Sequence, residues 1–150
     1  MNKRLKSSAV GIATLALLIV SCEKPDAELV GPLWRLESVT PEGASAIKPD
    51  PSRTYTLQFF DDSTFVGVAD CDDLFGRYWI LNRYIHKISL SGVTRRGCDE
   101  ATPSVDEYYP MGILNSSIMV YEISGNMLAL DLDIPYQVGD DSILNFETSD

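Results

Sequence analysis

Histidine is almost absent from this chain, since His86 is the only one in 150 residues. A zinc site takes several clustered ligands, and a Ser-His-Asp triad needs a histidine beside its serine. No serine lies in the Gly-x-Ser-x-Gly sequence of a nucleophile elbow. We therefore expect a protein that is not an enzyme and needs no cofactor. His86 is in phase with Ile88 and Leu90, so we expect a core or rim histidine that points inward.

Basic residues are also scarce. Lysine and arginine together number 12, against 22 aspartates and glutamates, so the formal net charge is −10. Such a chain repels nucleic acid and anionic membrane surfaces. We expect no nucleic-acid partner. The acidity fits a well-solvated protein, or alternatively a surface that captures a basic protein partner.

No apolar run is comfortably long enough to span a membrane, but the N-terminus carries a shorter one. Lys3, Arg4 and Lys6 precede an apolar run over residues 9–20, as in a signal peptide. The run ends in Ser21-Cys22, which resembles the lipobox of bacterial lipoproteins. We interpret residues 1–21 as a lipoprotein signal peptide and Cys22 as the lipidated N-terminus. The alternatives are an uncleaved anchor, or cleavage elsewhere that leaves Cys22 a plain thiol.

Removal of residues 1–21 would take the net charge from −10 to −13. Residues 22–32 then form a polar tether that spans at most about 35 Å, and residues 33–150 form one domain of ordinary size. Glu23 follows the lipidated cysteine, where an aspartate retains some lipoproteins in the inner membrane. We expect a location in the cell envelope, lipid-anchored at the outer membrane, with either the periplasmic or the surface face possible.

Two further cysteines, Cys71 and Cys98, remain in a chain exported to an oxidising compartment. Two thiols allow one pairing, so we predict a Cys71–Cys98 disulfide.

Acidic residues surround the first of these cysteines. Asp70, Asp72 and Asp73 suggest a calcium loop, but Leu74 and Phe75 occupy the fifth and sixth positions, where an EF-hand needs an oxygen ligand and a glycine. We expect no metal. We predict instead a charged rim, possible as a binding surface, in which the basic side chains neutralise the aspartates; these are Arg77, Arg95 and Arg96.

Alternating apolar residues predict about eight antiparallel strands. They cover residues 33–39, 54–60, 64–70, 76–81, 84–91, 118–123, 127–133 and 142–147. One helix is expected over residues 102–117, with an apolar stripe of Val105, Tyr108, Tyr109 and Ile113. The fold class is therefore mainly β (α+β): a small, partly closed barrel or sheet with one helix packed on it. Its interior would hold side chains or one ligand. We expect a monomer.

The order of motifs resembles the META domain, or HslJ-like, family of bacterial envelope lipoproteins, over about residues 31–148. The motifs are Trp34-x-Leu36, Phe65-x-Gly67 leading to Cys71, Gly76-x-Tyr78, Thr94-x-x-x-Cys98, Glu107-Tyr108, Tyr121 with Gly125-Asn126-x-Leu128-x-Leu130, and Leu144-x-Phe146. The resemblance implies a compact β-rich domain, no known catalytic activity and an association with envelope stress.

Three functions follow as hypotheses. The first is a non-enzymatic, lipid-anchored envelope protein with an accessory or binding role. The second is an acidic inhibitor or binder of a basic hydrolase, which the net charge motivates. The third is a small-ligand carrier that uses the barrel mouth.

Overall fold

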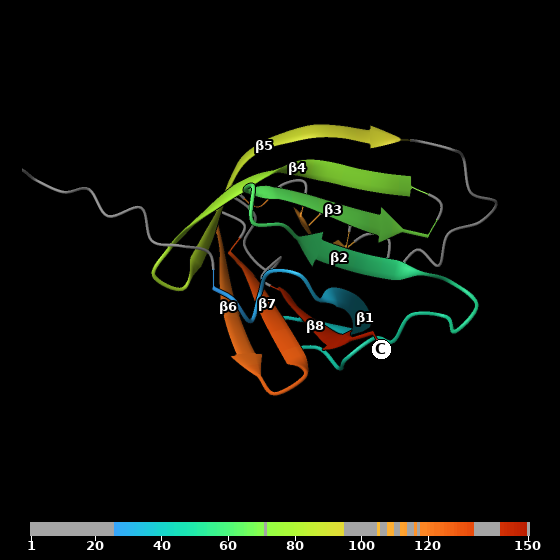
Figure 1. Ribbon diagram of the computed structural model, residues 1–150. Coiled ribbons are helices and arrows are strands. Elements are labelled where there is room, and N and C mark those ends of the chain that lie inside the picture. Colours follow the sequence, from blue (N-terminus) through green and yellow to red (C-terminus); the bar gives the residue numbers. More distant parts are fainter. Residues whose placement is uncertain are drawn as a thin grey trace, which may run out of the picture.

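The computed structural model describes residues 26–70, 72–94, 105, 108–109, 112–113, 116, 118–133 and 142–149, with the backbone alone at 87–91, 93 and 133. Eight antiparallel strands close into a barrel in which each strand pairs with its neighbours in the sequence, and β8 pairs with β1 (Figure 1). The strands are β1 (Leu33–Pro41), β2 (Tyr55–Phe59), β3 (Thr64–Ala69), β4 (Asp72–Leu81), β5 (Tyr84–Thr94), β6 (Ile118–Ser124), β7 (Met127–Asp133) and β8 (Ser142–Thr148). Among these residues, no helix is both long and apolar enough to cross a membrane.

The side chains that the alternating pattern predicts to face inward on β7 and β8 are buried in the core. Leu128, Leu130 and Leu132 of β7 are fully buried, and Leu144 and Phe146 of β8 are buried beside them. Successive side chains on a strand point to opposite faces, so every second residue enters the barrel. The predicted fold class of about eight antiparallel strands is therefore confirmed, and the barrel is closed.

Strand β4 begins four residues earlier than its apolar pattern indicates. Asp72 pairs with Ala69, and Asp73 pairs with Val68, so both aspartates belong to the ladder rather than to an acidic loop. Asp70 has a positive φ of 56°, which suits the tight turn between β3 and β4. The expected loop is thus a short hairpin turn.

The inward placement of His86 was wrong. Its neighbour Ile85 is fully buried, and the imidazole of His86 stacks on Trp79, with ring centroids 4.2 Å apart and planes 21° apart. Trp79 is 44% exposed, so this stack lies on the outer face. The alternation of His86 with Ile88 and Leu90 indicated the wrong face because the pairing of β4 with β5 shifts register twice. The shifts lie between Phe75 and Gly76 and between Arg77 and Tyr78. Such irregularities change which residues of a strand face the core.

A helical segment fills the barrel from within. Val105, Tyr108, Tyr109 and Ile113, which form the predicted stripe, have helical backbone. Three of them are fully buried in the core, and Tyr108 packs against it. Figure 1 shows pieces of this segment between the two walls of the barrel.

Tyr109 fixes that segment to the sheet. Its hydroxyl donates a hydrogen bond of 2.5 Å to the backbone carbonyl of Thr56 on β2. Its ring makes edge-to-face contacts with Tyr55 and Phe146, at centroid distances of 5.7 and 6.0 Å. Complete burial raises the pKa of Tyr109 far above its ordinary value, because the anion would lose its water.

Gly67 makes this contact possible. A Cβ atom at position 67 would lie 3.1 Å from the Tyr109 hydroxyl and 3.1 Å from the Thr56 carbonyl oxygen. Both distances are too short for comfortable contact. The sequence predicts a bulge or a close backbone approach at this glycine, and the structure shows the close approach.

Apolar side chains pack closely in the part of the interior that the structure describes. The space between Leu57, Phe59, Phe65, Tyr78, Ile85, Ile113 and Met119 has about 0 Å³ open to a water molecule. Tyr78 donates its hydroxyl to the Phe60 carbonyl at 2.7 Å. Burial, together with the nearby charges of Asp62 and Asp61, raises the pKa of Tyr78 to about 12.

We expect Tyr109→Phe to lower the free energy of unfolding by about 1–2 kcal/mol, because the Thr56 carbonyl loses its buried donor. Gly67→Ala should also destabilise, by about 1–3 kcal/mol, through overpacking. Urea denaturation measures both, and Tyr84→Phe, at an exposed ring, is the control.

The two changes should not add. Without the Tyr109 hydroxyl, one of the two close contacts of the new Cβ disappears, so Gly67→Ala should cost at least about 0.5 kcal/mol less in the Tyr109→Phe background. Strict additivity in this double-mutant cycle would show that the hydroxyl and Gly67 are not coupled.

Candidate functional site

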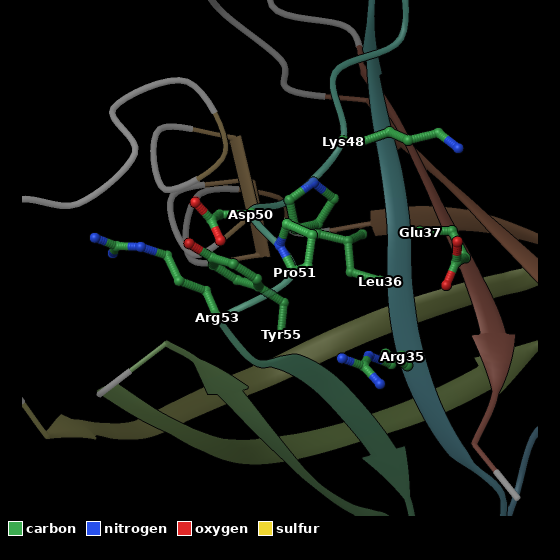
Figure 2. Close-up of a pocket in the computed structure, with 9 residues that line it drawn as sticks. Arg35, Leu36, Glu37, Lys48, Asp50, Pro51, Arg53 and Tyr55 are labelled. Carbon is green, nitrogen blue, oxygen red and sulfur yellow. The ribbon is translucent and has the colours of Figure 1, made fainter.

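A surface cleft of about 240 Å³ lies between β1 and the loop that precedes β2. Arg35, Leu36 and Glu37 of β1 form one wall, and the loop over residues 48–53 forms the other, with Tyr55 beyond it. In Figure 2, Pro51 and Tyr55 lie near the centre, while the side chains of Arg53 and Lys48 extend away from it in opposite directions. The cleft is thus apolar at its base and carries charges of both signs at its edge.

The loop reaches this position because it returns along β1. Val39 and Ile47 exchange two backbone hydrogen bonds, of 2.8 and 2.7 Å. The connection between β1 and β2 therefore covers part of the barrel wall.

An Asp-Ser turn holds the end of the loop. The carboxylate of Asp50 accepts hydrogen bonds from the hydroxyl and the backbone N–H of Ser52, at 2.7 and 2.8 Å. These bonds lower the pKa of the Asp50 carboxyl below its ordinary value. The backbone N–H of Arg53 also bonds to the Asp50 carbonyl, at 2.9 Å, so the turn positions the arginine.

Arg53 joins this cleft to the predicted acidic rim. Its guanidinium Nη1 lies 2.7 Å from Oδ2 of Asp70, in a salt bridge with both side chains about four-fifths buried. The backbone N–H of Asp70 also bonds to the Thr54 carbonyl, at 2.7 Å. Asp70 is therefore neutralised by Arg53, which is not one of the three arginines predicted for the rim.

The other two aspartates of the rim lie at the start of β4. The backbone N–H of Asp73 bonds to the hydroxyl of Thr94 on β5, at 2.9 Å, and that hydroxyl lies 3.3 Å from the Asp73 carboxylate. Asp72 and Asp73 are both partly buried. The structure thus brings Asp70, Asp72 and Asp73 to one end of the barrel.

The assignment of Arg77 to this rim was wrong. Arg77 pairs with Thr64 across the β3–β4 ladder, four residues along β4 from Asp73. Its charge acts instead on Asp62, whose pKa is lowered mainly by hydrogen bonds from Thr64 and also by Arg77. The remaining predicted site residues lie outside the described part of the chain; these are Cys22, Cys71, Arg95, Arg96 and Cys98.

Arg53 left little signal in the sequence, because it is 17 residues from its partner. The Asp50-x-Ser52 turn was the one local hint that its backbone is fixed. The cleft thus combines an apolar base with charged side chains at its edge. Within the described residues, no group of three His, Cys, Asp or Glu side chains is placed to hold a metal ion.

Comparison with known proteins identifies the fold. A family model described as the META domain matches residues 27–137. No curated protein matches the chain.

Three solved structures are similar. A protein from Burkholderia xenovorans, solved by NMR, is 19% identical with a TM-score of 0.62, and 99% of each chain is covered. A second NMR structure is 16% identical with a TM-score of 0.58, covering 81% of this chain and 92% of the other. A DUF4847 family protein from Bacteroides vulgatus is 13% identical with a TM-score of 0.54, covering 81% and 96%. These likenesses show the fold alone.

We expect Asp70→Asn to lower the free energy of unfolding by about 0.5–1 kcal/mol at low salt, through loss of the bridge to Arg53. Asparagine tolerates the positive φ of this turn, so Asp70→Ala should cost about 1 kcal/mol more. Denaturation in low salt and in 1 M NaCl measures both changes. The Asp70→Asn loss should shrink in high salt. A loss that salt does not alter would contradict a contribution from the ion pair.

Proposed function

Because the chain belongs to the META domain family, we propose that it is a non-enzymatic protein of the cell envelope with an accessory or binding role. Lipid on Cys22 would hold it to the outer membrane, and the barrel would act through its outer surface. The lipobox-like Ser21-Cys22 after an apolar run supports the anchor. The association with envelope stress stays a prediction from the family resemblance.

The filled interior is the observation that carries this proposal. The space between seven described interior side chains, among them Phe59, Tyr78 and Ile113, has about 0 Å³ open to water, and Tyr109 is buried in the same core. The only histidine of the chain stacks on Trp79 at the outer face. Binding is therefore assigned to the surface of the barrel, and a carrier role would need a site outside this space.

The Cys71–Cys98 disulfide remains part of the proposal. Cys71 is two residues from Asp73, and Asp73 pairs with Thr94 in the ladder. Cys98 follows Thr94 by four residues, a stretch that spans at most about 14 Å. Both thiols are thus within reach of one end of the barrel, near the Arg53–Asp70 bridge.

The inhibitor hypothesis requires the carboxylates of this end to bind a cationic partner. Asp70 is already bonded to Arg53 at 2.7 Å. An incoming basic side chain would have to compete with that bond, so the structure gives this alternative no added support.

For the anchor, we expect a clickable fatty acid fed to expressing cells to label the full-length protein and not Cys22→Ala. Ser21→Ala is the matched control, because it keeps a small residue before the cysteine and should label normally. Membrane fractionation should find wild type and Ser21→Ala in the membrane and release Cys22→Ala. Equal labelling of all three proteins would refute lipidation at Cys22.

For the disulfide, mass spectrometry of the unreduced mature protein should find the Cys71 and Cys98 peptides joined and two protons lighter than the pair of thiols. Cys71→Ser with Cys98→Ser should lose about 2–4 kcal/mol of unfolding free energy. If both cysteines of protein purified from the envelope can be alkylated without reduction, the disulfide does not form and this part of the proposal is wrong.

A further inference from the structure

Large apolar side chains gather on the outer face of the barrel at the β4–β5 turn. Trp79, Leu81, Tyr84 and Ile118 are 44%, 46%, 47% and 39% exposed. We call these four residues the hairpin patch. They are four of the nine large apolar side chains that are exposed among the described residues. Contiguous exposed apolar surface usually marks an interaction site, whereas single exposed residues do not.

The strand register makes the patch continuous. Leu81 pairs with Tyr84, and Trp79 pairs with His86. His86 in turn pairs with Ile118 on β6. Residues directly opposite in an antiparallel ladder lie on the same face, so the patch crosses three neighbouring strands. The imidazole of His86, stacked on Trp79, holds the indole ring against the sheet.

The described chain begins beside this patch. The Tyr121 hydroxyl contacts the Asp26 carboxylate at 3.3 Å, and the Tyr121 N–H bonds to the carbonyl of Arg83 in the β4–β5 turn at 3.1 Å. Asp26, Glu28 and Arg83 also line one surface hollow of about 190 Å³. In Figure 1, the start of the described chain, in blue, lies next to the β4–β5 turn.

Cys22 precedes Asp26 by four residues, so the chain between them spans at most about 14 Å. A lipid on Cys22 would therefore hold Asp26, and the neighbouring turn, close to the bilayer surface. This short chain would leave little space between the patch and the bilayer. Few partners other than lipid would fit there, so lipid is the partner that we expect to cover the patch.

We propose that the hairpin patch docks into the headgroup–acyl boundary of the membrane to which Cys22 is anchored. This inference rests on the proposed lipid anchor. Tryptophan and tyrosine favour that boundary, because their rings are apolar and their N–H or O–H stays hydrated. Arg83 is exposed at the turn, where its charge would lie near the lipid phosphates.

Docking is driven by apolar contact rather than by charge. Asp26, Glu28 and Glu122 lie near the turn, and anionic lipid would repel them. The anchor supplies a high effective concentration of lipid, so a small patch suffices. We therefore expect docking on zwitterionic phosphatidylcholine vesicles, with little dependence on salt.

The test uses the lipidated full-length mature protein in phosphatidylcholine vesicles that contain lipid brominated near the headgroup. The chain has two tryptophans, and Trp34 is buried in the core, so it serves as an internal reference. Bromolipid should quench roughly half of the fluorescence, because it reaches Trp79 alone. Trp79→Phe should remove this quenching and leave the emission of Trp34.

A second variant tests the patch without changing the probe. Tyr84→Ser should reduce the quenching of Trp79 by at least about twofold, because the neighbouring ring no longer enters the boundary. Val66→Ser is the matched control, since Val66 is 42% exposed on β3 and lies outside the patch. It should leave the quenching unchanged.

The outcomes separate this inference from the anchor. If mass spectrometry and flotation show lipid on Cys22 but Trp79 is not quenched, the docking proposal is wrong and the anchor stands. If Cys22 carries no lipid, both fail. A third outcome is that bromolipid does not quench Trp79 and the protein forms a dimer that Tyr84→Ser dissociates. In that case the patch binds a second copy, and the lipid proposal is overturned.

Discussion

The buried hydrogen bond from Tyr109 to the Thr56 carbonyl ties the helical segment in the core to the barrel wall. A closed eight-stranded barrel must fill its interior, because an empty apolar space forfeits dispersion contacts. Here the strands and a helical segment fill it together, and Tyr109 fixes their relative position. Gly67 follows from that contact, since any Cβ there would press on both partners of the bond. One buried hydrogen bond thus joins two segments that are 53 residues apart in the sequence.

The described part of the interior is closely packed, and the strands that enclose it present different side chains on their outer face. The same strand that lines the core with Leu74 and Tyr78 carries Trp79 and Leu81 on its other face. These exposed groups contribute nothing to the burial that drives folding, and their exposure carries an aggregation risk. At the opposite end of β4, the Arg53–Asp70 bridge and the cleft beside it form a polar surface. The barrel therefore has two chemically different ends.

Much of the fold was predictable because alternation records which face of each strand is buried. Seven of the strands lie close to the expected ranges, and Met127–Asp133 matches them at both ends. The start of β4 was not predictable, because Asp72 and Asp73 are strand residues of polar character. The orientation of His86 was missed for another reason: the shifts between β4 and β5 depend on pairing, which no single strand encodes. Arg53 and Trp79 were missed as site residues because their roles depend on contacts with other segments.

Strand β4 connects the two ends of the barrel, the β4–β5 turn and the turn at Asp70, and its length limits how far apart they lie. Its ten residues span at most about 30 Å. If the β4–β5 turn docks on lipid, the turn at Asp70 is held away from the bilayer, by less than this distance because barrel strands are tilted. A single anchor on Cys22 would let the barrel rotate about its tether, whereas the hairpin patch adds a second contact that fixes its orientation. The polar cleft would then face the aqueous side. Such an arrangement would let one end contact the membrane while the other stayed open to a soluble partner.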